Sequence, residues 1–201
     1  MKKVLYILIC GLTLLTITGC SYSDVFNNKD TNNKDSNVTD NKNEPSTKPN
    51  EDKKGIEVTI GQNIQYDDNY NISFIESYFT RNVEPTNPDS YYTYFPASDG
   101  NTYLVLKTVI KNLDTELLAG EKLPKGKLIY DGKYKYDAIT VMEEDDGSEL
   151  SQYSFYMDID PLTTKKIWYM VEVPQEIESN TNASLVMQYN FNSKTYNVKI
   201  R

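Results

Sequence analysis

The sequence predicts an all-β protein, an immunoglobulin-like sandwich of two sheets over residues 56–201. Apolar residues alternate at period two in several short runs, as expected of strands with one buried face. Asn, Asp, Gly and Pro separate these runs. No window of about a dozen residues shows a helical period. Roughly seven to nine strands of this spacing favour a two-sheet sandwich over a single meandering sheet.

The first twenty residues have the pattern of an export signal. Lys2 and Lys3 precede an apolar stretch, Val4 to Ile17, in which Thr13 and Thr16 are the polar side chains. The stretch is shorter than the roughly 20 residues that a membrane-spanning helix needs. A cleaved signal peptide over residues 1–19 is therefore preferred to a transmembrane anchor.

The end of this leader, Ile17-Thr18-Gly19-Cys20, resembles the lipobox of bacterial lipoproteins, with Thr18 in place of the usual Ala or Ser. The resemblance implies cleavage before Cys20 and a diacylglycerol group on its thiol. Acyl chains such as palmitate would then hold the protein on the extracytoplasmic face of the cell membrane. Two buried chains give stable anchoring where one does not. Because Cys10 would leave with the leader, the mature chain would contain no free thiol.

Residues 20–55 change composition abruptly and predict a disordered tether behind the lipidated cysteine. Asn, Asp and Lys dominate, and the segment 27–30 (Asn-Asn-Lys-Asp) recurs at 32–35. So little apolar surface cannot offset the entropy of ordering the chain. A coil of this length spans about 30–35 Å and would act as a spacer. The alternative is that the repeat is itself a binding element.

The expected strands follow in chain order as 56–60, 72–79, 103–111, 128–130, 134–136, 138–142, 153–159, 167–173, 185–191 and 196–200. Pro174 ends one of them because it cannot donate to a ladder. Asp131-Gly132 predicts a tight hairpin, since both residues adopt positive φ readily. Asn192-Ser193 predicts a closing hairpin. The best helical candidate, 114–123, is short and contains Gly120.

Several short motifs resemble a large family of immunoglobulin-like extracellular domains of unknown function, common in lipoproteins of low-GC Gram-positive bacteria. They are the Gly-led strand 100–106 continuing to Lys111-Asn112, the Asp-Gly-Lys turn at 131–133 with Tyr136, and the strand ending at Pro174. The resemblance covers most of residues 56–201 and implies the fold. It implies no catalytic residues. The Pro- and Tyr-rich segment 81–100 departs from the family pattern.

Charge and composition exclude several functions. The chain has no histidine and two cysteines, which excludes Ser-His-Asp and Cys-His nucleophile systems. It carries 21 basic and 29 acidic residues, a net charge of -8. This balance argues against a nucleic-acid partner, because phosphate binding depends on Lys and Arg.

The acidic run Glu143, Glu144, Asp145 and Asp146 is a candidate calcium site, since calcium takes six to eight oxygen ligands. No other cofactor is expected. The spacing differs from that of an EF-hand loop, and the alternative is a solvated hairpin tip.

An aromatic run, Tyr91, Tyr92, Tyr94 and Phe95, is a candidate ligand-binding loop. Tyrosine suits recognition because it offers an apolar face and a hydroxyl. The alternative is that this loop folds back to cover an open end of the sandwich. Trp168 alternates out of register with its neighbours and is expected to be buried, packed under a loop, and the alternative is that it lies exposed.

These features together predict a lipid-anchored surface protein that binds an unknown protein or cell-envelope ligand without catalysis. The alternative is an accessory or regulatory subunit of a membrane complex. A more remote alternative is an enzyme that uses a metal or paired carboxylates, such as Asp158 and Asp160, which share a strand face in this prediction.

Overall fold

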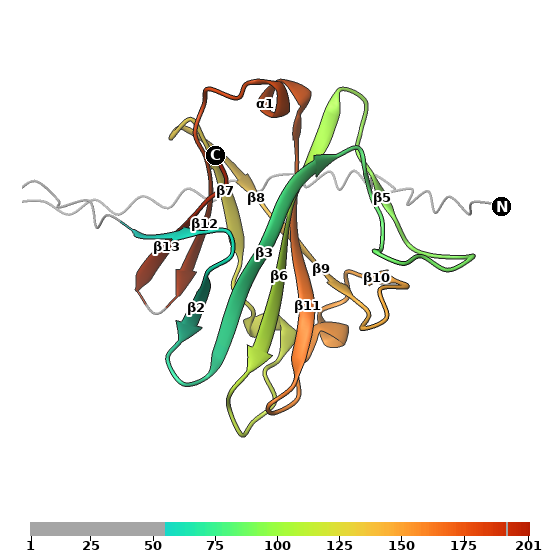
Figure 1. Ribbon diagram of the computed structural model, residues 1–201, viewed down its shortest axis with the longest axis vertical. Helices are drawn as coiled ribbons and strands as arrows, with labels where there is room; N and C mark the ends of the chain where they lie inside the picture. Colours follow the sequence, from blue (N-terminus) through green and yellow to red (C-terminus); the bar gives the residue numbers. More distant parts are fainter. Residues whose placement is uncertain (1–54, 192) are drawn as a thin grey trace, which may run out of the picture. The chain divides into compact units, whose positions relative to one another are not determined.

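The computed structural model of the chain describes residues 55–201 apart from Asn192 (Figure 1). Two main sheets contain most of the strands. The five-stranded sheet has the order β1-β13-β12-β7-β8, and the six-stranded sheet has the order β10-β9-β11-β6-β3-β2. The strands are β1 (Ile56–Thr59), β2 (Asn63–Tyr66), β3 (Tyr70–Thr80), β4 (Asn82–Val83), β5 (Phe95–Pro96), β6 (Asn101–Asn112), β7 (Gly126–Tyr130), β8 (Tyr134–Asp137), β9 (Ile139–Glu143), β10 (Leu150–Ser151), β11 (Thr164–Pro174), β12 (Leu185–Phe191) and β13 (Lys194–Lys199).

The strand order confirms the predicted immunoglobulin-like sandwich. Counting β3 as the first strand of that fold, β3, β6, β9 and β11 form one sheet, and β7, β8, β12 and β13 form the other. From β3 onward the chain therefore crosses between the two main sheets after β6, β8 and β11, and it also crosses earlier, between β1 and β2. In addition, β1 pairs in parallel with the last strand, β13, over four residues.

The inner core lies between the sheets and is formed by the strand faces that the alternation predicts. Leu104, Leu106 and Ile110 of β6 are fully buried there. The T-shaped ring pair Tyr169–Tyr189, with centroids 5.0 Å apart, joins the two sheets. Burial raises the pKa of both phenols, so both remain neutral.

Gly126 allows the sheets to approach closely at this point. A Cβ atom at this position would lie 3.2 Å from the side chains of Met187, Tyr169 and Tyr189. Packing therefore favours glycine at the start of β7, because a larger residue would force these side chains to shift.

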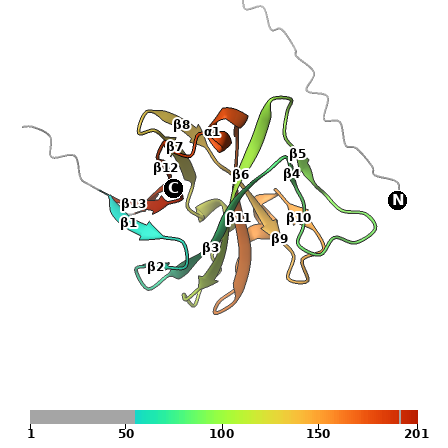
Figure 2. The same cartoon turned by 45° about the horizontal axis from the view of Figure 1, so that its top comes forward.

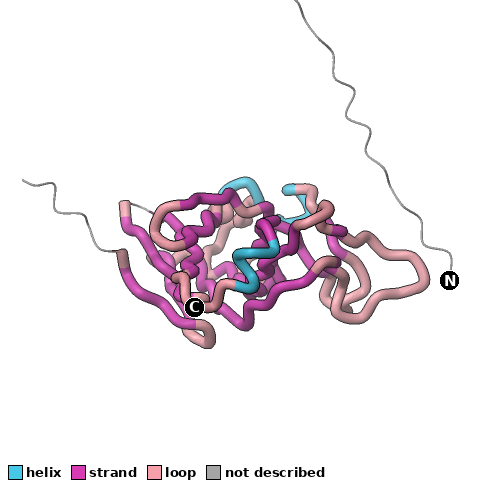
Figure 3. Tube along the Cα trace, turned by 90° about the horizontal axis from the view of Figure 1, so that it is seen from above, coloured by secondary structure: helices cyan, strands magenta, loops and turns pink. Residues whose placement is uncertain are grey.

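A second apolar cluster covers the outer face of the six-stranded sheet, which an isolated sandwich would leave open to water. We call it the outer cluster; its buried members are Val83, Tyr103, Val105, Val141, Leu150, Trp168 and Met170, with Tyr78, Phe95 and Ala97 packed against them. Residues 81–100, here the aromatic loop, and β10 bring in the covering side chains. Figures 2 and 3 show this loop extending from the sheet beside β10.

Two hairpin predictions are confirmed. Asp131 and Gly132 have φ values of 50° and 66°, and the amide of Lys133 donates to the carbonyl of Tyr130 at 3.0 Å, as in a turn whose two central residues both have positive φ. The strands β12 and β13 pair antiparallel up to Phe191 and Lys194.

The prediction of a strand over residues 153–159 is wrong. This segment contains a short 3-10 helix, η2 (Ser154–Met157), and Ile159 makes an isolated bridge to Leu118. Strand β10 pairs with β9 through two residues only, so this pairing ends before η2 begins and does not continue into residues 153–159. The turn instead buries Met157 and Ile159 in the inner core.

Helices are few in the described part of the chain. The helical candidate 114–123 contains one 3-10 turn, η1 (Gly120–Lys122), and α1 (Gln175–Ser179) follows Pro174 directly. No helix of residues 55–201 is long and apolar enough to cross a membrane.

Candidate functional site

The two sites that the sequence suggests separately, the aromatic loop and the acidic run, lie against each other. The acidic hairpin, residues 143–151, joins β9 to β10. The backbone amide of Asn87 in the loop donates to the carbonyl of Gly147 at 2.8 Å. Gly147 is buried at this contact and has a φ of 77°, so its left-handed backbone shapes the hairpin where the loop packs. The two segments therefore form one surface.

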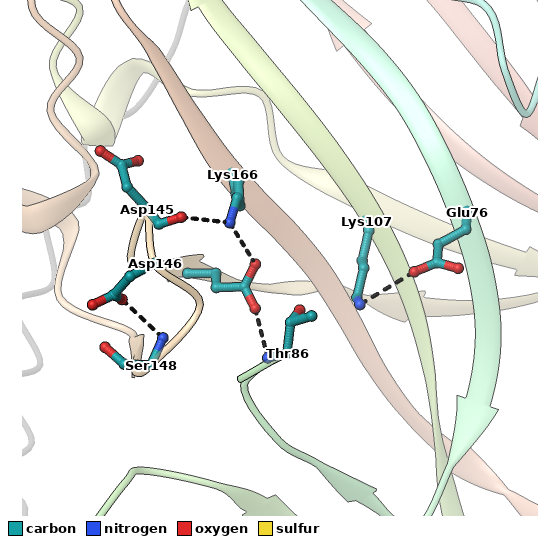
Figure 4. Close-up of polar contacts among 8 residues, drawn as sticks. Glu76, Thr86, Lys107, Asp145, Asp146, Ser148 and Lys166 are labelled. Atoms are coloured by element: carbon teal, nitrogen blue, oxygen red, sulfur yellow. Dashed lines mark hydrogen bonds and ion pairs between the residues drawn. The ribbon is translucent and has the colours of Figure 1, made fainter. Parts of the chain in front are cut away.

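Glu143 is the best-defined link between them. Its side chain is 3% exposed, and its Oε1 accepts a hydrogen bond from the backbone amide of Thr86 at 2.7 Å. Its Oε2 lies 3.5 Å from the ammonium of Lys166, which also donates to the carbonyl of Asp145 (Figure 4). This buried carboxylate is thus fully engaged in holding the loop.

Two further glutamates hold the loop in the same way. Glu149 Oε1 accepts a hydrogen bond from the amide of Thr93 at 2.8 Å. Glu172 Oε1 accepts one from the amide of Ser98 at 2.8 Å and one from the Asn101 side chain at 3.0 Å. Together with Glu143, these carboxylates fix main-chain atoms at three positions of one loop. Such fixation reduces the entropy lost when the loop contacts a ligand.

The predicted aromatic residues divide into exposed and supporting side chains. Tyr91 is 73% exposed, whereas Phe95 packs against the outer cluster. Tyr92 and Tyr94 are half-buried, with ring centroids 6.2 Å apart. The loop covers the outer face of the six-stranded sheet, and the alternative that it covers an open end of the sandwich is wrong. The prediction that Trp168 packs under a loop is confirmed, since it is 1% exposed.

The four residues of the calcium hypothesis are not brought together. Glu143 is buried and paired, while Glu144, Asp145 and Asp146 are exposed on the turn. The Asp146 carboxylate accepts the amide of Ser148 at 3.0 Å, and hydrogen bonding by Ser148 lowers its pKa. Within residues 55–201, no group of three or more acidic or cysteine side chains has an arrangement suited to a metal ion. Calcium binding stays an untested prediction.

Lys107 of β6 lies over two aromatic rings, one from the outer cluster and one packed against it. The ammonium of Lys107 lies 4.3 Å from the ring centroid of Trp168 and 5.3 Å from that of Tyr78. It also pairs with Glu76 at 3.2 Å. Burial, together with the charges of Glu76 and Glu143, raises the pKa of Tyr78 to about 12. The outer cluster therefore stabilises a cation through ring faces and a carboxylate together.

The contact with Ser98 should make the stability of the fold depend on pH. Burial alone would raise the pKa of Glu172, but hydrogen bonds from Asn101, Ser98 and Tyr103 outweigh it and lower the pKa. The unfolded chain then binds the proton more readily, so this stabilisation is present at neutral pH and is lost as the pH falls below 4.5. We expect Glu172→Gln to lower the free energy of unfolding by about 1–2 kcal/mol at pH 7.

Urea unfolding at pH 7 and pH 3 measures this effect. The difference between the parent and Glu172→Gln should shrink at the lower pH. Glu57→Gln, at an exposed position of β1, is the matched control and should change little at either pH. A gap between parent and Glu172→Gln of the same size at both pH values would contradict the assignment.

Two surface hollows lie outside the aromatic loop. One, of about 690 Å³, lies between β1 and β2 and contains a single carboxylate, Glu57. The other, of about 400 Å³, lies beside η1 and also contains one, Glu121. Asp158 Oδ1 accepts the amide of Gly120 at 2.7 Å, and neither Asp158 nor Asp160 lines either hollow. Neither hollow supplies a pair of carboxylates. Cys20 and the tether lie outside the described residues.

The fold resembles that of a solved β-sandwich structure from a Gram-positive bacterium. A crystal structure of an uncharacterized β-sandwich protein from Clostridium difficile 630 has a TM-score of 0.67 and 29% sequence identity, covering 75% of this chain and 97% of that chain. A conserved hypothetical protein from Bacillus anthracis has a TM-score of 0.48 and 12% identity, covering 71% of this chain and 94% of that chain. No protein-family model matches the chain, and no curated protein matches it.

Proposed function

We propose that this protein is a lipid-anchored surface protein whose sandwich binds a partner through the aromatic loop, without catalysis. The observation that carries the binding role is the loop itself. Main-chain amides at Thr86, Thr93 and Ser98 are held by three glutamates, while the Tyr91 ring is left 73% exposed. Loops held by a rigid scaffold are frequent recognition elements. An exposed aromatic ring on such a loop offers contact area at low entropic cost.

The anchoring part of the proposal is supported by the sequence. Lys2 and Lys3, the apolar stretch after them and the Gly19-Cys20 pair form the pattern of a lipoprotein leader. The polar composition of residues 21–54 suits a spacer between a membrane and a folded domain. The partner would then be a protein or another component of the cell envelope.

Photo-crosslinking on intact cells tests the binding role. A photoreactive amino acid in place of Tyr91 should form a discrete covalent adduct with a partner. The matched control places the same amino acid at Tyr134, which is 57% exposed on β8 of the other sheet. Adducts of equal yield and identity at both positions, or none at position 91, would contradict the proposal.

A further inference from the structure

The two segments that form the surface beside Tyr91 are both negatively charged. Residues 84–96 of the aromatic loop and 144–149 of the acidic hairpin contain six acidic side chains and no basic one. Asp89, Glu144, Asp145 and Asp146 are exposed. The lowered pKa of Asp146 keeps its carboxylate ionised near neutral pH. The tyrosine rings therefore stand in a field that attracts cations.

The lysine at the base of the hairpin, Lys166, is paired with a buried carboxylate. Lys166 is directed to the buried Glu143, with 3.5 Å between its ammonium and Oε2, and to the carbonyl of Asp145 at 2.9 Å (Figure 4). Both contacts lie at the junction of the hairpin with the sheet. Within residues 55–201, the side-chain carboxylates of Glu144 and Asp145 form no ion pair.

The molecule already contains the kind of contact that such a surface offers. Lys107 lies over the rings of Trp168 and Tyr78 and pairs with Glu76, so one cation is bound by ring faces and a carboxylate together. The exposed surface presents the same two kinds of group, tyrosine rings and carboxylates. Tyr91 and the Tyr92–Tyr94 pair supply ring faces, and the neighbouring acids supply carboxylates.

From this correspondence we infer that the aromatic loop and the acidic hairpin bind a partner segment that carries arginine or lysine side chains. This inference rests on the proposed function and names the chemistry of its partner. Guanidinium and ammonium groups bind the faces of tyrosine rings, by about 0.5–1 kcal/mol each at exposed sites. Carboxylates on either side orient them and speed association. Anionic polymers and anionic lipid surfaces would be repelled from the same place.

Fluorescence titration of the full chain, held in detergent, with a labelled octa-arginine peptide tests the inference. The aromatic variant Tyr91→Ala/Tyr92→Ala/Tyr94→Ala and the acidic variant Asp89→Asn/Glu144→Gln/Asp145→Asn should each weaken binding about tenfold. The matched control removes three exposed acids elsewhere, by Glu57→Gln, Asp68→Asn and Asp137→Asn, and should weaken binding less than about twofold. Tyr91→Ala alone, at an exposed position, should also weaken binding while leaving the fold intact.

The outcomes separate this inference from the proposed function. Equal weakening by the acidic variant and the control would show that the peptide senses overall charge, and would overturn the inference. Absence of peptide binding would do the same. If the peptide fails to bind but position 91 still crosslinks to a partner, the proposed function stands and the cationic partner is wrong. If both experiments fail, both are wrong.

Discussion

Replacing Trp168 with alanine should lower the free energy of unfolding by about 3–5 kcal/mol, the cost of removing a large buried aromatic side chain. Trp168 is 1% exposed and lies in the outer cluster under the aromatic loop. Its removal also takes away a ring face from the Lys107 ammonium, 4.3 Å from its centroid. A loss of this size is a large fraction of the stability of a typical domain.

Two measurements check this result. Urea unfolding gives the loss of stability, with Tyr91→Ala as the control, because that ring is 73% exposed and should cost less than about 0.5 kcal/mol. Hydrogen exchange should show faster exchange at the amides of Thr86, Thr93 and Ser98, since the loop loses the surface that it packs on. Equal stabilities of the Trp168→Ala variant and the parent, or unchanged exchange at those amides, would show that the loop does not depend on the outer cluster.

Replacing Cys20 with serine should abolish lipid attachment completely. The serine hydroxyl cannot take the place of the thiol in the thioether bond to diacylglycerol. Two acyl chains contribute about 0.8 kcal/mol per buried methylene, so the variant should lose essentially all of its lipid-dependent membrane attachment. Metabolic labelling of a Gram-positive host with an alkynyl palmitate, followed by cell fractionation, measures both effects.

Cys10 provides the matched control for this experiment. It is the other cysteine of the chain and lies within the proposed leader. Cys10→Ser should keep the label and the membrane fraction of the parent. Label retained by Cys20→Ser would contradict lipidation at this position, and label lost by Cys10→Ser would place the modified cysteine elsewhere.

The strands that form the inner core, and the hairpin turns between them, could be predicted from the local sequence pattern. Strand β12 alternates clearly between buried and less buried residues, and Pro174 marks the last residue of β11. The Asp131-Gly132 turn follows from the backbone freedom of two adjacent residues. These features depend on residues that are close together in the sequence, so each strand or turn can be recognised from its own residues.

The aromatic loop and its packing on the outer cluster could not be predicted in this way, because residues far apart in the sequence form these contacts. Thr86 and Glu143 are 57 positions apart, and Ser98 and Glu172 are 74 apart. The short strands β4, β5 and β10 exist through such contacts. One signal was present in the sequence. Residues 103–106 and 167–171 are almost continuously apolar, which is typical of strands buried on both faces.

The parallel pairing of β1 with β13 has a mechanical consequence. A tension applied upstream of Gly55 and resisted at the aromatic loop is transmitted by the backbone of residues 56–80, which contain β1, β2 and β3, and by the pairs that these strands form. A pull along β1 loads its four register pairs with β13, from Ile56–Tyr196 to Thr59–Lys199, in shear, so that they resist together and do not open one by one. If the protein is tethered at its N-terminal side and bound to a moving partner through the aromatic loop, the pairing of β1 with β13 is the first contact of the fold to carry the force. The rate at which force separates β1 from β13 would then set how long the fold survives under load, because forced unfolding is governed by the unfolding rate.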